Sequence, residues 1–213
     1  MTPDQLIAEL QAFEGNDRLF NPWRERCREY DLFDDAPQQK AARLKAHLDN
    51  PGARLVLLGE AAGYQGCRYS GITFTSEAMM LERALPRLPR LDHRLTSRER
   101  PFREPSATIV WGALYELGLQ DSTILWNTLP FHPIKGEALS NRTPSTSEIK
   151  LGAGYLAMLL AMLQPDVKLI AVGNKAREAL ELIGVTPYAA VRHPAMGGAN
   201  QFRDGMRQIA ATL

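Results

Sequence analysis

The chain has 213 residues, of which 45% are apolar and 23% charged, and its formal net charge is +1. This length fits one α/β domain with a buried core, and no apolar run approaches the roughly 18 residues that a membrane span needs. The N-terminal stretch MTPDQLIAEL is amphipathic and acidic, unlike a secretory signal. We therefore expect a single cytoplasmic domain over residues 1–213, without membrane association.

Cys27 and Cys67 are the only cysteines, and they lie far apart in the sequence. An iron–sulfur cluster or an all-cysteine zinc site needs four thiolates. The sequence therefore predicts two reduced thiols, as in cytosolic proteins, and no metal or other cofactor.

Strand-like and helix-like segments alternate along the chain. Four short apolar runs bounded by turn residues predict buried parallel strands at 54–60, 123–128, 168–173 and 188–193. Helical patterns occupy 38–48, 106–118, 145–164, 174–184 and 200–212. Ser106 is the expected N-cap and Gly118 the expected end of the second helix, and Ser145 with Glu148 forms a capping box. This alternation predicts an α/β fold, a three-layer α/β/α sandwich around a mostly parallel four-stranded sheet.

In such a sheet, ligands bind outside the carboxyl ends of the strands. These strand exits and the stretch after the first one carry carboxylates, imidazoles, an asparagine and aromatic rings, namely Glu60, Glu77, His132, His193, Asn127, Tyr64, Phe74 and Phe131. They lack a nucleophile elbow, a P-loop lysine, a dinucleotide fingerprint and closely spaced metal ligands. An asparagine amide beside an aromatic plate matches the edge and face of a pyrimidine, so we expect a base-reading pocket.

The same segments resemble motifs of the uracil-DNA glycosylase superfamily, in the order that the family has them. GEAAG at 59–63 resembles the family's Gly-Glu-Ala-Pro-Gly motif, and SGITFTSE at 70–77 resembles the end of the related Gly-Leu-Ala-Pro-Ala motif. ILWNT at 124–128 is similar to the strand that carries the uracil-reading asparagine. VGNKAREALELIG at 172–184 and RHPAMGG at 192–198 resemble the last two motifs.

The resemblance implies a role for each matched position. The backbone around Gly59, Ala61, Gly63 and Tyr64 would wrap a flipped nucleotide, Phe74 would stack on uracil, and Asn127 would bond its edge. His193 would donate to the uracil oxygen on which negative charge develops. Pro194, Met196 and Gly197 would enter the minor groove, with Met196 as the wedge.

Each role competes with a purely structural one. Phe74 could fill the core, Asn127 could end a strand, His193 could start a helix, and Met196 could pack within its loop. His132 and Arg192 have weaker functional claims, because turns often carry such residues.

Two departures from the family pattern concern the first motif. Ala61 occupies the place of the aspartate that positions water in the best-known branch, and Gly63 occupies the place of its barrier tyrosine. A nearby anion stabilises an oxocarbenium-like state, so we expect Glu60 or Glu77 to supply it and favour Glu60. Glu77 could instead be a helix-start residue beside Thr75 and Ser76. The chain lacks the cysteines that hold an iron–sulfur cluster in the Gly-Glu-Ala-Pro-Gly branch, so it would be a member without that cluster.

Seven arginines lie between residues 83 and 103, where Pro86, Pro89 and Pro101 prevent one long helix. Guanidinium groups pair with phosphates, so Arg94 and Arg98 are candidate DNA contacts, against a solvated loop as the alternative. The leading hypothesis is a monomeric, monofunctional glycosylase that removes uracil, or a related deaminated base, from DNA by hydrolysis. No lysine is expected in position for lyase chemistry. A non-catalytic nucleic-acid-binding protein and an unrelated small-molecule enzyme are the alternatives.

Overall fold

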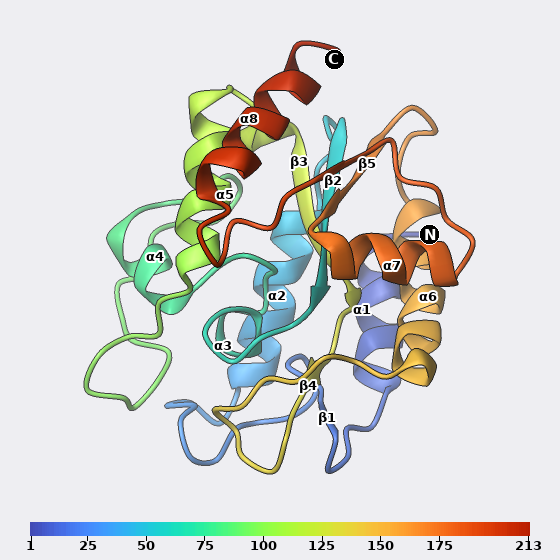
Figure 1. Ribbon diagram of the computed structural model, residues 1–213. Coiled ribbons are helices and arrows are strands. Elements are labelled where there is room, and N and C mark those ends of the chain that lie inside the picture. Colours follow the sequence, from blue (N-terminus) through green and yellow to red (C-terminus); the bar gives the residue numbers. More distant parts are fainter.

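The computed structural model describes all residues from Met1 to Leu213 (Figure 1). Its central sheet has four parallel strands in the order β3-β2-β5-β6. They are β2 (Leu55–Ala61), β3 (Thr123–Leu129), β5 (Lys168–Val172) and β6 (Ala189–Val191). All four predicted strands are therefore confirmed, and the parallel order brings their carboxyl ends to one edge.

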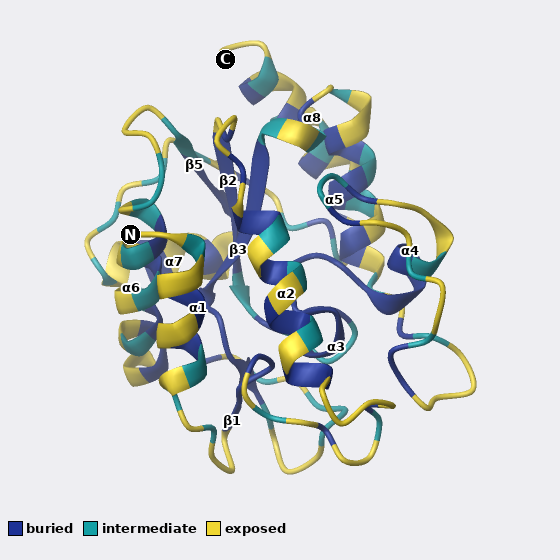
Figure 2. Ribbon diagram, turned by 180° about the vertical axis from the view of Figure 1, so that it is seen from behind, coloured by how far each residue is buried: buried dark blue, intermediate teal, exposed yellow.

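Helices cover both faces of this sheet, which confirms the three-layer prediction (Figures 1 and 2). The helices α1 (Pro3–Ala12), α6 (Thr146–Leu160) and α7 (Asn174–Leu182) pack with Val56 and Leu58 of β2. The helices α4 (Glu77–Glu82), α5 (Pro105–Glu116) and α8 (Ala199–Ala210) pack with Leu55 and Leu57. Successive residues of β2 thus alternate between two hydrophobic cores, as side chains of a strand do.

The helix α2 (Ala36–Leu48) reaches the edge strand β3 through one hydrogen bond. His47 Nε2 of this helix accepts a hydrogen bond of 2.8 Å from the Leu125 amide. Burial, and then the charge of Arg87, lowers the pKa of His47 to about 3, so the imidazole is neutral and free to accept. The helix therefore satisfies one backbone amide of this edge strand, where unpaired amides can otherwise pair with another chain.

The short elements were not predicted, because two to six residues carry too little periodicity to be read. They include α3 (Cys67–Ser70), α4, the 3₁₀ turn Gln120–Ser122, and β1 (Leu19–Phe20) paired antiparallel with β4 (His132–Pro133). None of the helices combines the length and apolarity needed to cross a membrane.

The helix caps decide where two helices begin. The capping box predicted at Ser145 and Glu148 is confirmed, and so is the end of α5 at Gly118, which has φ +67°. The predicted N-cap Ser106 is wrong, because α5 begins one residue earlier at Pro105 and Glu104 is the N-cap. Proline suits the first helical position, since its ring fixes φ and its missing N–H needs no partner there. Glu104 consequently stands at the carboxyl edge of the sheet.

Gly152 sets how closely α6 approaches β3. A Cβ atom there would overlap the Thr128 carbonyl oxygen and lie 3.0 Å from Leu129 Cα, both backbone atoms. We expect Gly152→Ala to lower the free energy of unfolding in urea by about 3 kcal/mol or more. Gly154→Ala in the same helix is the control. It meets nothing within 4 Å and should stabilise by about 0.5–1 kcal/mol. Equal stabilities of the two variants would contradict this packing.

Candidate active site

A cavity of about 560 Å³ opens at the carboxyl edge of the sheet. Pockets of this size hold small molecules or parts of larger ones. The wall is formed by residues 59–63, 65–67, 73–74, 104–106, 127, 141–142, 172–175, 192–193 and 195–196. The ends of β2 and β3 and the N-terminal ends of α5 and α7 thus contribute together, which is where a parallel sheet gathers its ligand site.

Phe74 and Asn127 meet over Gly59 at this wall. Gly59 pairs with Asn127 across the two strands, and a Cβ at Gly59 would lie 2.5 Å from Asn127 Oδ1 and 3.1 Å from Phe74 Cζ. Only glycine lets both side chains converge there. Phe74 has φ +49°, a strained value for a non-glycine residue, and residues with such strain cluster at active sites and ligand clamps. The Asn127 amide has no hydrogen-bond partner within the protein, so its donor and acceptor remain available to a ligand.

His193 reaches the same cavity from the loop after β6. Its Nδ1 accepts a hydrogen bond of 3.1 Å from the Ala195 amide, which leaves the proton on Nε2. Burial, and then Arg192, lowers the pKa of His193, so the ring is neutral near pH 7. The ring centroid lies 6.2 Å from that of Phe74. Nε2 has no partner within the protein and can donate to a bound group.

The two predicted acids lie in different places. Glu60 lines the cavity and has no hydrogen-bond partner, and burial raises its pKa against the opposing charge of Lys175. Glu77 is fully buried outside the cavity. Its carboxylate accepts from Arg94 Nε, Thr96 Oγ1 and the amides of Leu95, Thr96 and Phe102, at 2.6–3.1 Å. Although burial opposes it, this set of donors lowers the pKa of Glu77. The structure thus brings Glu60 to the site and uses Glu77 to hold the 94–102 loop.

Most of the arginine cluster is occupied by contacts within the protein. Arg94 binds Glu77 and the Arg98 carbonyl, and Arg98 lies over the Phe102 ring, 4.3 Å from its centroid. Arg83, Arg87 and Arg103 contact Tyr115, the Asp121 carbonyl and Glu82. Only Arg90 and Arg100 have no such partner, and none of the seven lines the cavity. The cluster is therefore less available to phosphates than its sequence indicates.

Tyr64 does not reach the cavity with its side chain. Its ring packs edge-on against Phe102, with the centroids 6.2 Å apart, while its amide donates to Asn141 Oδ1 at 3.2 Å. Asn141 itself lies against Gly63, where the family's barrier tyrosine would stand. In this chain the wall at Gly63 is therefore completed by an asparagine from a distant loop.

His132 is buried behind this wall. Arg68 Nη1 donates to His132 Nδ1 at 2.8 Å, so Nε2 carries the proton and faces the Ser140 carbonyl at 2.8 Å and Asn141 Oδ1 at 3.0 Å. Burial, and then Arg68, lowers the pKa of His132 to about 4, which keeps this tautomer neutral. His132 thus positions Asn141 without touching the cavity.

The predicted wedge lies at the rim of the cavity. Met196 is 94% exposed and has φ +53°, Gly197 follows with φ +77°, and the turn closes with a hydrogen bond from the Gly198 amide to the Ala195 carbonyl. Pro194 is buried and anchors the start of the turn. A long apolar side chain is thereby presented to solvent on a tight turn.

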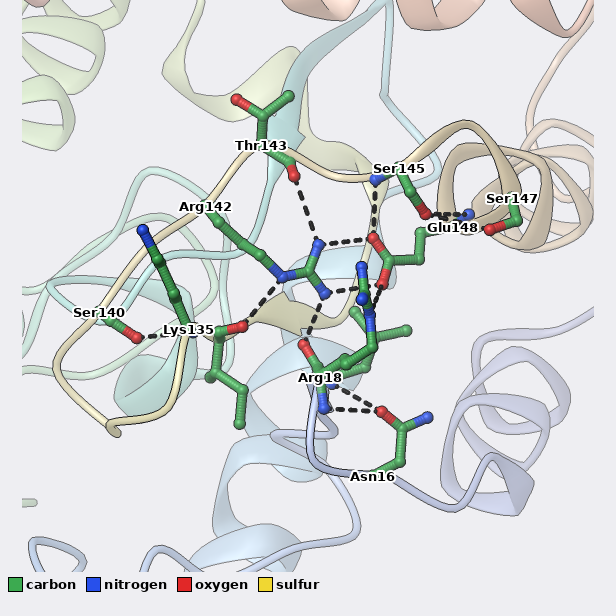
Figure 3. A network of polar contacts seen from close by, with 11 residues as sticks. Asn16, Arg18, Lys135, Ser140, Arg142, Thr143, Ser145, Ser147 and Glu148 are labelled. Carbon is green, nitrogen blue, oxygen red and sulfur yellow. Dashed lines mark hydrogen bonds and ion pairs between the residues drawn. The ribbon is translucent and has the colours of Figure 1, made fainter.

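Several polar residues of the wall were not among the predicted site residues, including Glu104, Asn141, Arg142 and Lys175. Glu104 and Lys175 stand at helix N-terminal ends, which share the strands' carboxyl edge. Arg142 forms two 2.7 Å bonds to Glu148 and also bonds the Ile134 and Arg18 carbonyls (Figure 3). This network fixes the loop that carries Asn141. Lys175 lines the cavity, although no lysine was expected in position for lyase chemistry.

No group of three or more His, Cys, Asp or Glu side chains lies close enough together to hold a metal ion. The polar groups of the wall that have no partner within the protein include the Asn127 amide, the Nε2–H of His193 and the carboxyl groups of Glu60 and Glu104. This set of groups is suited to binding a neutral, hydrogen-bonding heterocycle.

A family model of the uracil DNA glycosylase superfamily matches residues 46–212, which include this whole cavity wall. The chain belongs to this superfamily. Membership makes it a protein of the DNA glycosylase type, with DNA as its partner. Among solved structures, wild-type SMUG2 from Pedobacter heparinus has a TM-score of 0.69 at 16% identity, covering 99% of this chain and 95% of that chain. That likeness confirms the fold of the superfamily, whereas a search of the curated proteins finds no match.

Proposed function

We propose that this superfamily member is a monofunctional glycosylase that hydrolyses the N-glycosidic bond of deoxyuridine, or of a related deaminated nucleotide, in DNA. The observation that carries the proposal is the convergence of Phe74, Asn127 and His193 on one cavity. The flipped base would stack on Phe74 and present its edge to the Asn127 amide, as flipped bases are read in other enzymes.

Bond cleavage builds negative charge on the base and positive charge on the sugar. The Nε2–H of neutral His193 is a donor for the base oxygen that gains charge, and such donors stabilise a transition state more than a ground state. Glu60, at the end of β2, is the carboxylate that stabilises the sugar cation and orients the attacking water. The abasic sugar and the free base are the products.

Lys175 does not oppose a monofunctional reaction. Its ammonium forms an ion pair of 2.7 Å with Glu178, and this hydrogen bond raises the pKa of the lysine. A protonated amine has no lone pair to attack the abasic aldehyde, so lyase chemistry is suppressed.

A panel of oligonucleotides tests this function. Strands containing uracil, hypoxanthine, xanthine or a thymine mismatch are incubated with the protein and then analysed with and without alkaline cleavage. We expect base release from the uracil strand and strand breaks only after alkali. Folded protein that releases none of these bases would refute the proposal.

Met196 provides a test of base flipping. An apolar wedge fills the gap that an extruded base leaves in a duplex. We expect Met196→Ala to slow base release from duplex DNA by about tenfold, with a smaller effect on single strands, since a loss of about 1.4 kcal/mol is tenfold in rate. Leu32→Ala, which removes an exposed apolar side chain outside the cavity, is the control. An equal loss on both kinds of DNA would argue against the wedge.

Ala61 favours a second candidate, a non-catalytic binder of damaged DNA. Ala61 lines the cavity and supplies no side chain to position water. Tight binding of uracil-containing or abasic DNA without cleavage, unchanged in Glu60→Ala, would favour this candidate.

A further inference from the structure

Two enclosed carboxyl groups stand apart from all the others in the chain. Six acidic residues are buried or partly buried: Glu25, Asp31, Glu60, Glu77, Glu104 and Glu148. Four of them accept hydrogen bonds from the protein, as buried acids normally do. Glu60 and Glu104 accept none, and both line the cavity. The function described so far uses Glu60 and leaves Glu104 unexplained.

The fold holds Glu104 firmly in this position. Its carbonyl accepts from the Ala107 and Thr108 amides at 3.1 and 3.4 Å, and Pro105 fixes the first turn of α5. Its carboxyl group lies over Gly66, where a Cβ atom would overlap an oxygen of Glu104 and lie 2.9 Å from Cδ. Glycine at position 66 thus makes room for the acid.

The surroundings of Glu104 favour its neutral form. The titratable or charged groups that share the cavity are Glu60, Cys67, Arg142, Lys175, Arg192 and His193. None of them changes the pKa of Glu104, which burial alone raises to about 7. Its neighbour in sequence, Arg103, pairs with Glu82 instead. Glu104 therefore holds its proton to a higher pH than an ordinary carboxyl group does.

We propose, on the basis of the proposed glycosylase function, that Glu104 is a further catalytic residue that protonates the departing base. As the C1′–N bond breaks, its electron pair goes to the base, and the O–H bond of Glu104 breaks as the base gains that proton. Water then adds its oxygen and one hydrogen to C1′, and its other proton restores Glu104. The sum is the hydrolysis already proposed, and no further reactant is needed.

No other group of the wall fits this role. Neutral His193 donates a hydrogen bond through Nε2, but giving up that proton would leave an imidazole anion. Lys175 is paired with Glu178. Glu60 also faces a second hollow, which it shares with Lys175 and α6. Burial raises the pKa of Glu60 too, but the charge of Lys175 opposes that rise, whereas no cation opposes it at Glu104. Two acids in different surroundings thus divide into a proton donor and an anion, which is a recurring arrangement in hydrolases.

The test is Glu104→Gln, compared with Glu99→Gln, which changes an exposed side chain of the 94–102 loop. Single-turnover release of uracil is measured between pH 5.5 and 9. The wild-type rate should fall as pH rises through about 7, because the neutral acid is the active form. Glu104→Gln should be slower by about 10²-fold and lose that limb of the profile, while abasic DNA still binds. Glu99→Gln should match the wild type.

A second variant keeps the acid but moves it. Gly66→Ala forces the carboxyl group of Glu104 aside, so it should also slow release while the acid is retained. In addition, Glu104→Gln should melt at a higher temperature than the wild type at pH 8. Burial disfavours the charge that Glu104 carries above pH 7 in the wild type. At pH 4 the side chain at position 104 is neutral in both proteins, so the difference in melting temperature should disappear.

The outcomes separate this inference from the proposed function. Wild-type protein that releases no base refutes the function itself. If the wild type releases uracil and Glu104→Gln keeps its rate and profile, only the role of Glu104 is refuted. If Glu104→Gln keeps the full rate but that rate no longer depends on pH, position 104 acts by hydrogen bonding without proton transfer. That result also refutes the proposed role of Glu104.

Discussion

Replacing His193 by alanine is expected to lower the single-turnover rate of uracil release by about 10²–10³-fold, which is the usual cost of one donor to a developing anion. The Nδ1 atom is held by the Ala195 amide, so the Nε2 proton is fixed toward the cavity. Because the ring is neutral, it stabilises the developing anion through a fixed hydrogen bond and does not need to change its protonation state. The loss should therefore be similar at pH 6.5 and pH 8.

The control is His93→Ala. His93 is exposed, pairs with Asp92 and lies outside the cavity, so its removal should leave the rate unchanged. Binding of uracil-containing DNA by His193→Ala should change less than the rate, because the interaction grows as charge develops. If His193→Ala loses DNA binding and rate to the same extent, His193 contributes to DNA binding in general and not specifically to the transition state.

The strands and the centre of the site could be predicted because their signals are local. Apolar runs ended by turn residues fixed the position of each strand, and parallel strands bring their exits together. Gly59, Asn127 and His193 lie at three such exits, so reading along the chain was enough to place them in one pocket. Phe74 was a candidate aromatic plate from the sequence, but its stacking role came from the resemblance, since nothing in its own neighbourhood distinguishes it from a core residue.

The rest of the site depends on contacts between distant segments. Glu104 lies at a helix start and not at a strand exit, and a misplaced cap at Ser106 hid it. Asn141 completes the wall at Gly63 only because His132 and Arg142 fix its loop. No periodicity in residues 130–145 indicates this. The parts of the wall that most alter the family pattern are thus the parts that local patterns do not reveal.

The arginine cluster is a second feature whose role depends on contacts between distant segments. Charge density along a sequence predicts phosphate binding only while the charges are free. Here Glu77, seventeen or more residues away from its partners, accepts from Arg94 and from three amides of the 94–102 loop. The sequence offered Glu77 as a candidate for catalysis, and the structure makes it the centre around which this loop folds.

Glu77→Ala is therefore expected to destabilise the protein by about 3–5 kcal/mol, the cost of leaving a buried charge and its hydrogen bonds without a partner. Urea unfolding at pH 7 measures this. The wild type should lose the stabilisation as pH falls below the ordinary carboxyl value of 4.5, because the folded-state pKa of Glu77 is lowered. Glu82→Ala, which breaks the exposed pair with Arg103, should cost less than about 1 kcal/mol. If Glu77→Ala is as stable as Glu82→Ala and yet loses base release, Glu77 and not Glu60 supplies the carboxylate that stabilises the sugar cation.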